Sequence, residues 1–187
     1  MERSSLRVMD MRYLIVTAQD RFENGRADSV LLEFYETGDQ AAEKVLINEA
    51  VAIDFDADGK VDFKKGDVNH NGKENSIDQR LLEIFANSYL KMNWGNTGVK
   101  RTRYMKIFAE DFHGDGTPNA VKLQLYECRA DGSQERLVSW HGLFDGNNDG
   151  TLECIVHADA NHDGVIEQID GVIVQSLANV FHMFKWR

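Results

Sequence analysis

The sequence predicts an α+β fold made by tandem duplication of a ββββα-type unit, in which antiparallel β-hairpins with aspartate-rich loops are followed by a helix. Three observations predict it: an internal repeat that spans the chain, short segments of alternating apolar residues, and a helical apolar pattern late in each repeat. The two predicted copies are residues 1–96 and residues 97–187.

The internal repeat keeps one register along the chain. Arg12 recurs as Arg103, and after a single inserted residue the pairing continues until Trp94 recurs as Trp186. Other identical pairs in this register are Asp20 with Asp111, Tyr35 with Tyr126, Asp54 with Asp145, Asp67 with Asp159, and Asp78 with Asp170. Chance matches would not hold such a register, so the pattern predicts a duplication.

Segments of alternating apolar and polar residues predict the strands in order. In the first copy they are residues 13–18, 29–35, 44–53 and 60–63. In the second copy they are residues 104–109, 120–126, 136–144 and 151–156. Residues 95–98 read Gly-Asn-Thr-Gly, which is typical of a turn and predicts the join between the copies.

Each copy is predicted to end in a helix, because apolar residues recur there at spacings of three and four. The two predicted stripes are Ile77, Leu81, Ile84, Phe85, Tyr89 and Met92, and then Ile169, Ile173, Leu177, Phe181 and Phe184. Such a stripe most simply packs against a core, and the alternative is a face that binds a partner protein. The sequence leaves open whether the copies share one core or form two lobes.

Composition narrows the classes of function. The net charge of −10 argues against nucleic acid as a partner, because phosphate binding needs clustered Lys and Arg. No apolar run approaches the roughly 18 residues of a membrane span, and residues 1–10 lack the apolar region of a signal peptide. Carboxylates instead cluster with Asn and Gly, a pattern that favours divalent cations. Cys128 and Cys154 are predicted to be free, partly buried thiols.

Two aspartate-rich loops stand directly before the predicted helices, at residues 67–78 and 159–170. Side chains with oxygen atoms occupy positions 1, 3, 5, 9 and 12, glycine occupies position 6, and position 7 offers its backbone carbonyl. The candidate ligands are Asp67, Asn69, Asn71, Lys73 and Asp78 in the first loop, and Asp159, Asn161, Asp163, Val165 and Asp170 in the second. Ligands that are all oxygen suit Ca²⁺ rather than Zn²⁺ or copper.

These two loops resemble the calcium loop of EF-hands, and more closely that of dockerins, which also ends in Asp and leads straight into a helix. The resemblance covers only the loops and helices. It implies Ca²⁺ as the ion and, as one hypothesis, a dockerin-like interaction through two helix faces. It implies no particular partner, because the predicted strands between the loops depart from the dockerin pattern. His70 and His162, at position 4, are predicted to face solvent.

A second pair of loops lies between predicted strands. Its candidate ligands are Asp54, Asp56, Asp58, Lys60 and Asp62, and then Asp145, Asn147, Asp149, Thr151 and Glu153, with Lys60 and Thr151 acting through their carbonyls. Because the pattern ends at position 9, it resembles the FG-GAP-type calcium hairpins of integrin α-subunit propellers. The chain has too few predicted strands to close such a propeller.

A third pair of loops is uneven. One loop has Asp111 and Asp115 as candidate ligands, with His113 at position 3. Its twin begins with Asp20 but has Phe22 at position 3. Because a phenyl ring cannot coordinate a cation, the Asp20 loop is predicted to be a weak or lost site.

The leading hypothesis is a non-enzymatic calcium-binding protein whose fold, and whose contact with a partner, depend on Ca²⁺. Neutral Asn ligands predict a dissociation constant of about 10⁻⁵ to 10⁻³ M, as in extracellular modules, which favours an extracellular or periplasmic location. The alternatives are a dockerin-like interaction module and a cytosolic calcium buffer or sensor, the latter favoured by the missing signal peptide. No enzyme is predicted, because the sequence shows no Ser-His-Asp order, His-Glu-x-x-His motif, phosphate-binding Gly loop or Cys-His pair.

Overall fold

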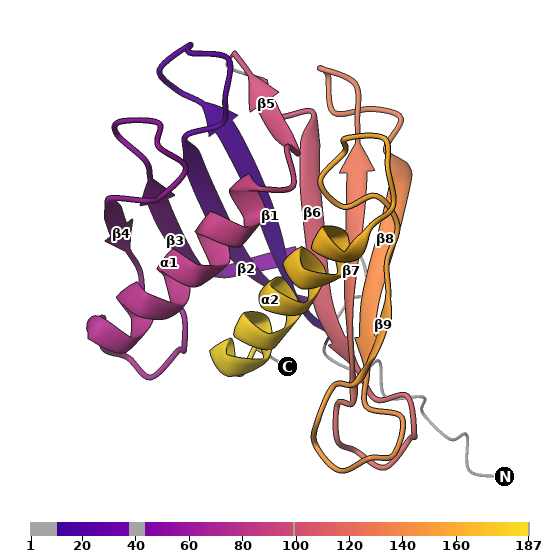
Figure 1. Ribbon diagram of the computed structural model, residues 1–187. Helices are drawn as coiled ribbons and strands as arrows, with labels where there is room; N and C mark the ends of the chain where they lie inside the picture. The colour runs from indigo at the N-terminus through magenta and orange to yellow at the C-terminus, as the bar shows by residue number, and fades with distance from the viewer. Residues whose placement is uncertain (1–10, 38–43, 99, 187) are drawn as a thin grey trace, which may run out of the picture.

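The computed structural model describes residues 11–37, 44–98 and 100–186, and for Cys154 the backbone alone. The strands in these ranges form one nine-stranded sheet in the order β4-β3-β2-β1-β6-β7-β8-β9, with β5 beside β1 (Figure 1). They are β1 (Arg12–Asp20), β2 (Ser29–Thr37), β3 (Lys44–Ile53), β4 (Phe63–Lys65), β5 (Gly95–Thr97), β6 (Arg103–Glu110), β7 (Ala120–Glu127), β8 (Arg136–Phe144) and β9 (Cys154–Val156). The helices are α1 (Ser76–Leu90) and α2 (Gln168–Phe184).

The single sheet overturns the predicted fold class. A tandem repeat of ββββα-type units is expected from the sequence, whereas the described ranges form one largely antiparallel sheet of nine strands with two helices. Its centre is the antiparallel pair β1–β6, in which Leu14 lies opposite Ile107 and Val16 opposite Met105. Alternation of apolar residues shows which face of a strand is buried but not which strand lies beside it. Pairing β1 with β6 hydrogen-bonds two edges that would otherwise be exposed.

Both helices lie on the same face of the sheet (Figure 1). Helix α1 packs on β2, β3 and β4, helix α2 packs on β7, β8 and β9, and the helices pack on each other. Where the helices meet, the hydroxyl oxygens of Ser88 on α1 and Ser176 on α2 are 2.7 Å apart. Helix α1 is also joined to β1, because the Tyr89 hydroxyl donates to the Val16 carbonyl at 3.0 Å. The buried apolar residues of both halves form a single cluster, so the molecule has one core rather than two lobes.

The predicted apolar stripes of the helices are mostly buried, with three exceptions. Ile77, Ile84 and Ile169 are 60%, 39% and 42% exposed, whereas Leu82, outside the predicted stripe, is fully buried. The buried face differs from the stripe because each helix contacts both the sheet and the other helix.

The strand predictions agree with the structure except at the short edge strands and at the join. Strands β3 and β8 span the predicted residues, while β4 and β9 begin later than predicted, at Phe63 and Cys154. The Gly-Asn-Thr segment predicted as a turn forms β5, which pairs parallel with β1. Gly95 is required there, because a Cβ atom on it would lie 2.7 Å from the Ala27 Cβ.

Two further predictions concern the membrane and the cysteines. No helix in the described ranges has the length and apolar character needed to cross a membrane, which agrees with the composition. Cys128 is a free, half-buried thiol, as predicted. The predictions for the Cys154 side chain and for a signal peptide in residues 1–10 fall outside the described part of the chain.

Candidate metal centres

Six loops share one main-chain conformation. In each, the residue at position 4 is left-handed, with φ between 54° and 72°, and the glycine at position 6 has φ between 79° and 92°. These glycines are Gly25, Gly59, Gly72, Gly116, Gly150 and Gly164. Because a side chain at position 6 would be strained in this conformation, the recurring Asp-to-Gly spacing in the sequence has a local structural cause. The shared turn folds each loop back over its first Asp.

The first Asp of a loop accepts hydrogen bonds from the loop itself. In the helix-preceding loop, Asp67 accepts the N–H groups of Asn71 at 3.2 Å and Gly72 at 2.7 Å. The same two-oxygen arrangement is present at Asp20, Asp111, Asp145 and Asp159. Asp54 is different, because its Oδ2 accepts the Gly59 N–H at 2.8 Å while its Oδ1 is buried without a hydrogen-bond partner.

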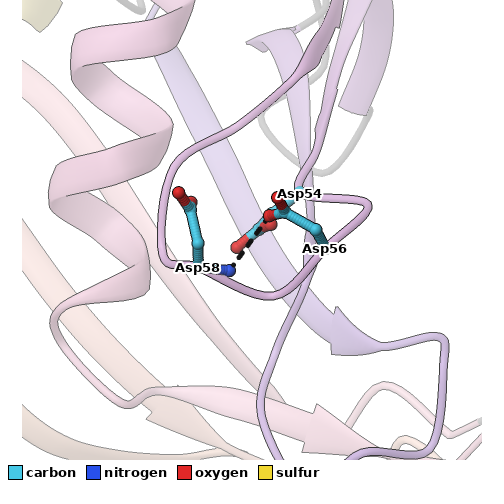
Figure 2. A group of neighbouring side chains, drawn as sticks. All are labelled: Asp54, Asp56 and Asp58. Carbon is cyan, nitrogen blue, oxygen red and sulfur yellow. Dashed lines mark hydrogen bonds between the residues drawn. The ribbon is translucent and has the colours of Figure 1, made fainter.

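Asp54, Asp56 and Asp58 form a compact carboxylate cluster at the end of β3 (Figure 2). One oxygen from each lies within 4.8 Å of the others. Asp54 is only 2% exposed, while Asp56 and Asp58 are exposed. A buried carboxylate oxygen without a partner is costly, and two neighbouring carboxylates add to that cost by repulsion. A bound cation would remove both costs.

A second cluster lies in the loop between β8 and β9. Asp145, Asp149 and Glu153 each contribute an oxygen within 4.8 Å of the others. Asp145 is 4% exposed, and its two oxygens already accept the N–H groups of Asp149 at 3.1 Å and Gly150 at 2.6 Å. Hydrogen bonds from the main chain and then the side chain of Thr151 lower the pKa of Asp149, so this carboxylate keeps its charge at more acidic pH than an ordinary Asp.

The loop before α1 is tied to the helix by its last carboxylate. Asp78 is fully buried and accepts the N–H groups of Asn69 at 3.2 Å and Asn75 at 3.0 Å. Asn75, at position 9, caps the helix by accepting the Ile77 N–H at 2.8 Å. Position 12 therefore joins the start of the loop to the first turn of α1.

The loop before α2 is built in the same way. Asp170 is buried and accepts the N–H groups of Ala160 at 2.8 Å, Asn161 at 3.1 Å and Glu167 at 2.7 Å. Burial by itself raises the pKa of Asp170, but these three hydrogen bonds outweigh burial and leave the pKa below its usual value. Asp170 therefore carries a stable negative charge beside the loop.

Two of the predicted loops each bring three carboxylates together. Within the described ranges, the groups of three carboxylates close enough to share one ion are Asp54 with Asp56 and Asp58, and Asp145 with Asp149 and Glu153. The predicted carboxylate ligands outside such a group are Asp62, Asp67, Asp78, Asp111, Asp115, Asp159, Asp163 and Asp170. At the position-7 residues Lys60, Lys73, Thr151 and Val165, the main-chain N–H donates to the side chain at position 5.

The third pair of loops keeps the shared conformation in both members. Asp115 accepts the Thr117 N–H at 2.8 Å and the Asn148 side-chain amide at 2.6 Å, and these two bonds lower its pKa. The bond to Asn148 joins this loop to the Asp145 loop. In the Asp20 loop, Phe22 stands at position 3 and is 49% exposed. The loop therefore lacks a ligand at position 3 but keeps the shared turn, with Glu23 and Gly25 at positive φ.

The two position-4 histidines do not face solvent, contrary to the prediction. The His70 ring lies 4.3 Å from the Trp186 ring, and the His162 ring stacks at 4.7 Å on Trp94. His162 Nδ1 is also 2.8 Å from the Met92 carbonyl oxygen. The left-handed conformation at position 4 turns these side chains away from the loop, and each reaches the Trp beyond the end of the other helix.

Sequence reasoning also missed a contact that holds the Asp54 loop in place. The Val61 N–H donates to Asn87 Oδ1 on α1 at 2.9 Å. Asn87 recurs as Asn179 in the repeat, which marks the position, but the pattern alone does not identify its partner.

No family model, curated protein or solved structure matches the chain. The function proposed for it therefore depends on the geometry of its own loops.

Proposed function

We propose that the chain is a non-enzymatic calcium-binding protein in which Ca²⁺ stabilises the fold. The observation that carries the proposal is the Asp54 cluster. Asp54 is 2% exposed and its Oδ1 has no partner, and one of its oxygens lies within 4.8 Å of an oxygen of Asp56 and of Asp58. The cluster supplies only oxygen, which favours Ca²⁺ over Zn²⁺.

The proposed role of the ion is structural. Binding to the folded state alone stabilises it by about 2.7 kcal/mol per site when free calcium is 100 times the dissociation constant. With exposed Asp56 and Asp58 as partners of Asp54, the expected dissociation constant is about 10⁻⁵ to 10⁻³ M.

The test is thermal unfolding of the wild type and Asp54→Asn with calcium, with magnesium and with chelator. In calcium the variant should melt below the wild type, because it replaces a charged ligand with a neutral one. In chelator the variant should instead melt above the wild type, with a free energy of unfolding about 1 kcal/mol larger, because Asp54→Asn removes repulsion between neighbouring carboxylates.

The matched control for this test is Asp131→Asn, an exposed carboxylate outside the metal loops that also accepts a main-chain N–H, from Ser133 at 2.9 Å. Its melting temperature should rise with calcium as much as that of the wild type. Equal calcium responses in the wild type and Asp54→Asn would rule out this site.

A second candidate function is a dockerin-like interaction through the helices. It is favoured by apolar side chains exposed on them, namely Ile77 at 60%, Val172 at 51% and Ile169 at 42%. Ile77 and Ile169 lie in the first turns of α1 and α2, where the helices overlap the ends of the loops at residues 67–78 and 159–170. Calcium-dependent association that is lost in Ile77→Ser would support this function.

A further inference from the structure

Asp54, with Ala57 and Gly59 of the same loop, borders a cavity of about 420 Å³. The cavity lies between the loop after β1, the loop after β3, the end of α1 and strand β5, and its lining includes Asp20, Arg26, Asp54, Lys91, Asn93 and Thr97. This volume is in the range of small-molecule sites. An ion held by Asp54 would therefore have one side open to a space large enough for a small ligand.

The second carboxylate cluster also borders a cavity. Asp145 and Asp149 line a space of about 300 Å³, together with Asn119, Asn148 and His182. Unlike the first, its lining contains no Lys or Arg. Both cavities are therefore lined by carboxylates, but only the first is also lined by Lys and Arg.

Charge in the first cavity comes in two opposed sets. Asp20 and Asp54 supply the carboxylates, and Arg26 and Lys91 are exposed cations on the lining. Arg103 also lines the cavity, but its Nε donates to Glu127 Oε1 at 2.9 Å, so its charge is already paired. Without a metal ion, the carboxylates would repel an anion that approaches the two cations.

A cation at Asp54 reverses this repulsion. Ca²⁺ takes six to eight oxygen ligands, and three side chains leave coordination positions for oxygens from outside the protein. An oxyanion in the cavity could then contact the ion and the two cationic side chains at once.

We propose that the first cavity binds a small oxyanion, a carboxylate or a phosphate ester, which bridges the ion at Asp54 to Arg26 and Lys91. This inference rests on the proposed calcium function. It makes the ion and the anion mutually dependent, because each must raise the affinity for the other by the same factor.

The experiment is calorimetric titration of the full chain with acetate and, separately, with glycerol phosphate, in saturating calcium or in chelator. Sodium chloride at equal ionic strength corrects for screening. One or both probes should bind in calcium at least about tenfold more tightly than in chelator. The acetate and glycerol phosphate arms decide which oxyanion the cavity prefers.

Two variants locate the anion site. Arg26→Gln combined with Lys91→Gln should lose the calcium-dependent anion binding but keep its calcium affinity in the absence of anion. Arg80→Gln combined with Arg129→Gln is the matched control, because it removes two exposed cations outside both cavities and should leave anion binding unchanged.

The outcomes separate this inference from the proposed function. If calcium binds and Asp56→Asn, at an exposed position, weakens it, but neither anion binds better with calcium, the inference is wrong and the function stands. Anion binding that persists in the Arg26 and Lys91 double variant also overturns it. If Asp56→Asn and Asp58→Asn leave calcium binding unchanged, the proposed site itself fails.

Discussion

Asp54 and Asp145 occupy the same position in similar loops but have different hydrogen bonds. The Asp149 N–H donates both to Asp145 Oδ1 at 3.1 Å and to Asn147 Oδ1 at 3.0 Å. In the other loop the Asp58 N–H donates to Asp56 Oδ1 at 3.2 Å, and the Asp54 Oδ1 is buried and unpartnered. A buried carboxylate oxygen without an N–H donor gains the most from a cation, so Asp54 is the strongest candidate ligand among the described residues.

His141 gives a prediction for pH at the residue scale. It is fully buried, its Nδ1 accepts the Ala158 N–H at 3.2 Å, and burial, followed by the charges of His162 and His157, lowers its pKa to about 4. The unfolded chain, with an ordinary pKa near 6.5, binds the proton more readily. The contribution of His141 to stability is therefore complete above about pH 6.5 and is lost as the pH falls towards 4.

The measurement is urea unfolding of the wild type and His141→Gln in chelator at several pH values between 7 and 4. The wild type should lose on the order of 3 kcal/mol more than the variant over this range, because glutamine does not titrate. Parallel pH profiles for the two proteins would contradict the assignment.

Each helix is held at its start by the loop that precedes it and beyond its end by the loop that precedes the other helix. Helix α1 begins at Ser76, inside the loop at residues 67–78, and the Trp94 beyond its end stacks on His162 of the other helix-preceding loop. The Trp186 beyond α2 contacts His70 of the first loop in return. The Asn93 side chain adds a 2.8 Å bond to the Asn161 carbonyl. A change in either loop is therefore transmitted to both helices.

This cross-connection predicts the effect of His70→Ala and His162→Ala. Each should destabilise the protein by about 1 kcal/mol through the lost ring contact. His70→Ala should shift the emission of Trp186 to longer wavelength, and His162→Ala that of Trp94. Fluorescence is best read in a Trp140→Phe background, because Trp140 is 45% exposed and would dominate the red edge of the spectrum. Unchanged emission in both variants would show that the contacts are absent in solution.

At the scale of the whole molecule, the β1–β6 pair makes one structural unit. The core cluster draws residues from both halves of the chain, and the two helices cover the same face of one sheet. A helix and its neighbouring strands therefore cannot unfold without exposing core residues of the other half.

The expected result is a single cooperative unfolding transition. In chelator, tryptophan fluorescence and far-ultraviolet circular dichroism should give the same midpoint, and the calorimetric and van't Hoff enthalpies should agree. Two separated transitions would indicate two independent halves and would contradict the single core.

The turns and many of the strands could be predicted from the sequence, because each depends on residues that are close together in the chain. The spacing of Asp and Gly specifies the six turns, since only glycine adopts the position-6 conformation freely, and alternation specifies strands such as β3 and β8. The cluster of Asp54, Asp56 and Asp58 was likewise proposed from spacing alone.

Only the tertiary structure decided how these pieces meet. The β1–β6 pairing, the contacts of His70 and His162 with distant tryptophans, and the cavity beside Asp54 all join segments far apart in the chain. Side-chain periodicity records whether a residue is buried but not against what, because many partners would bury the same apolar surface equally well. The buried, unpartnered oxygen of Asp54 was also decided by the tertiary structure, because its burial depends on residues outside the loop.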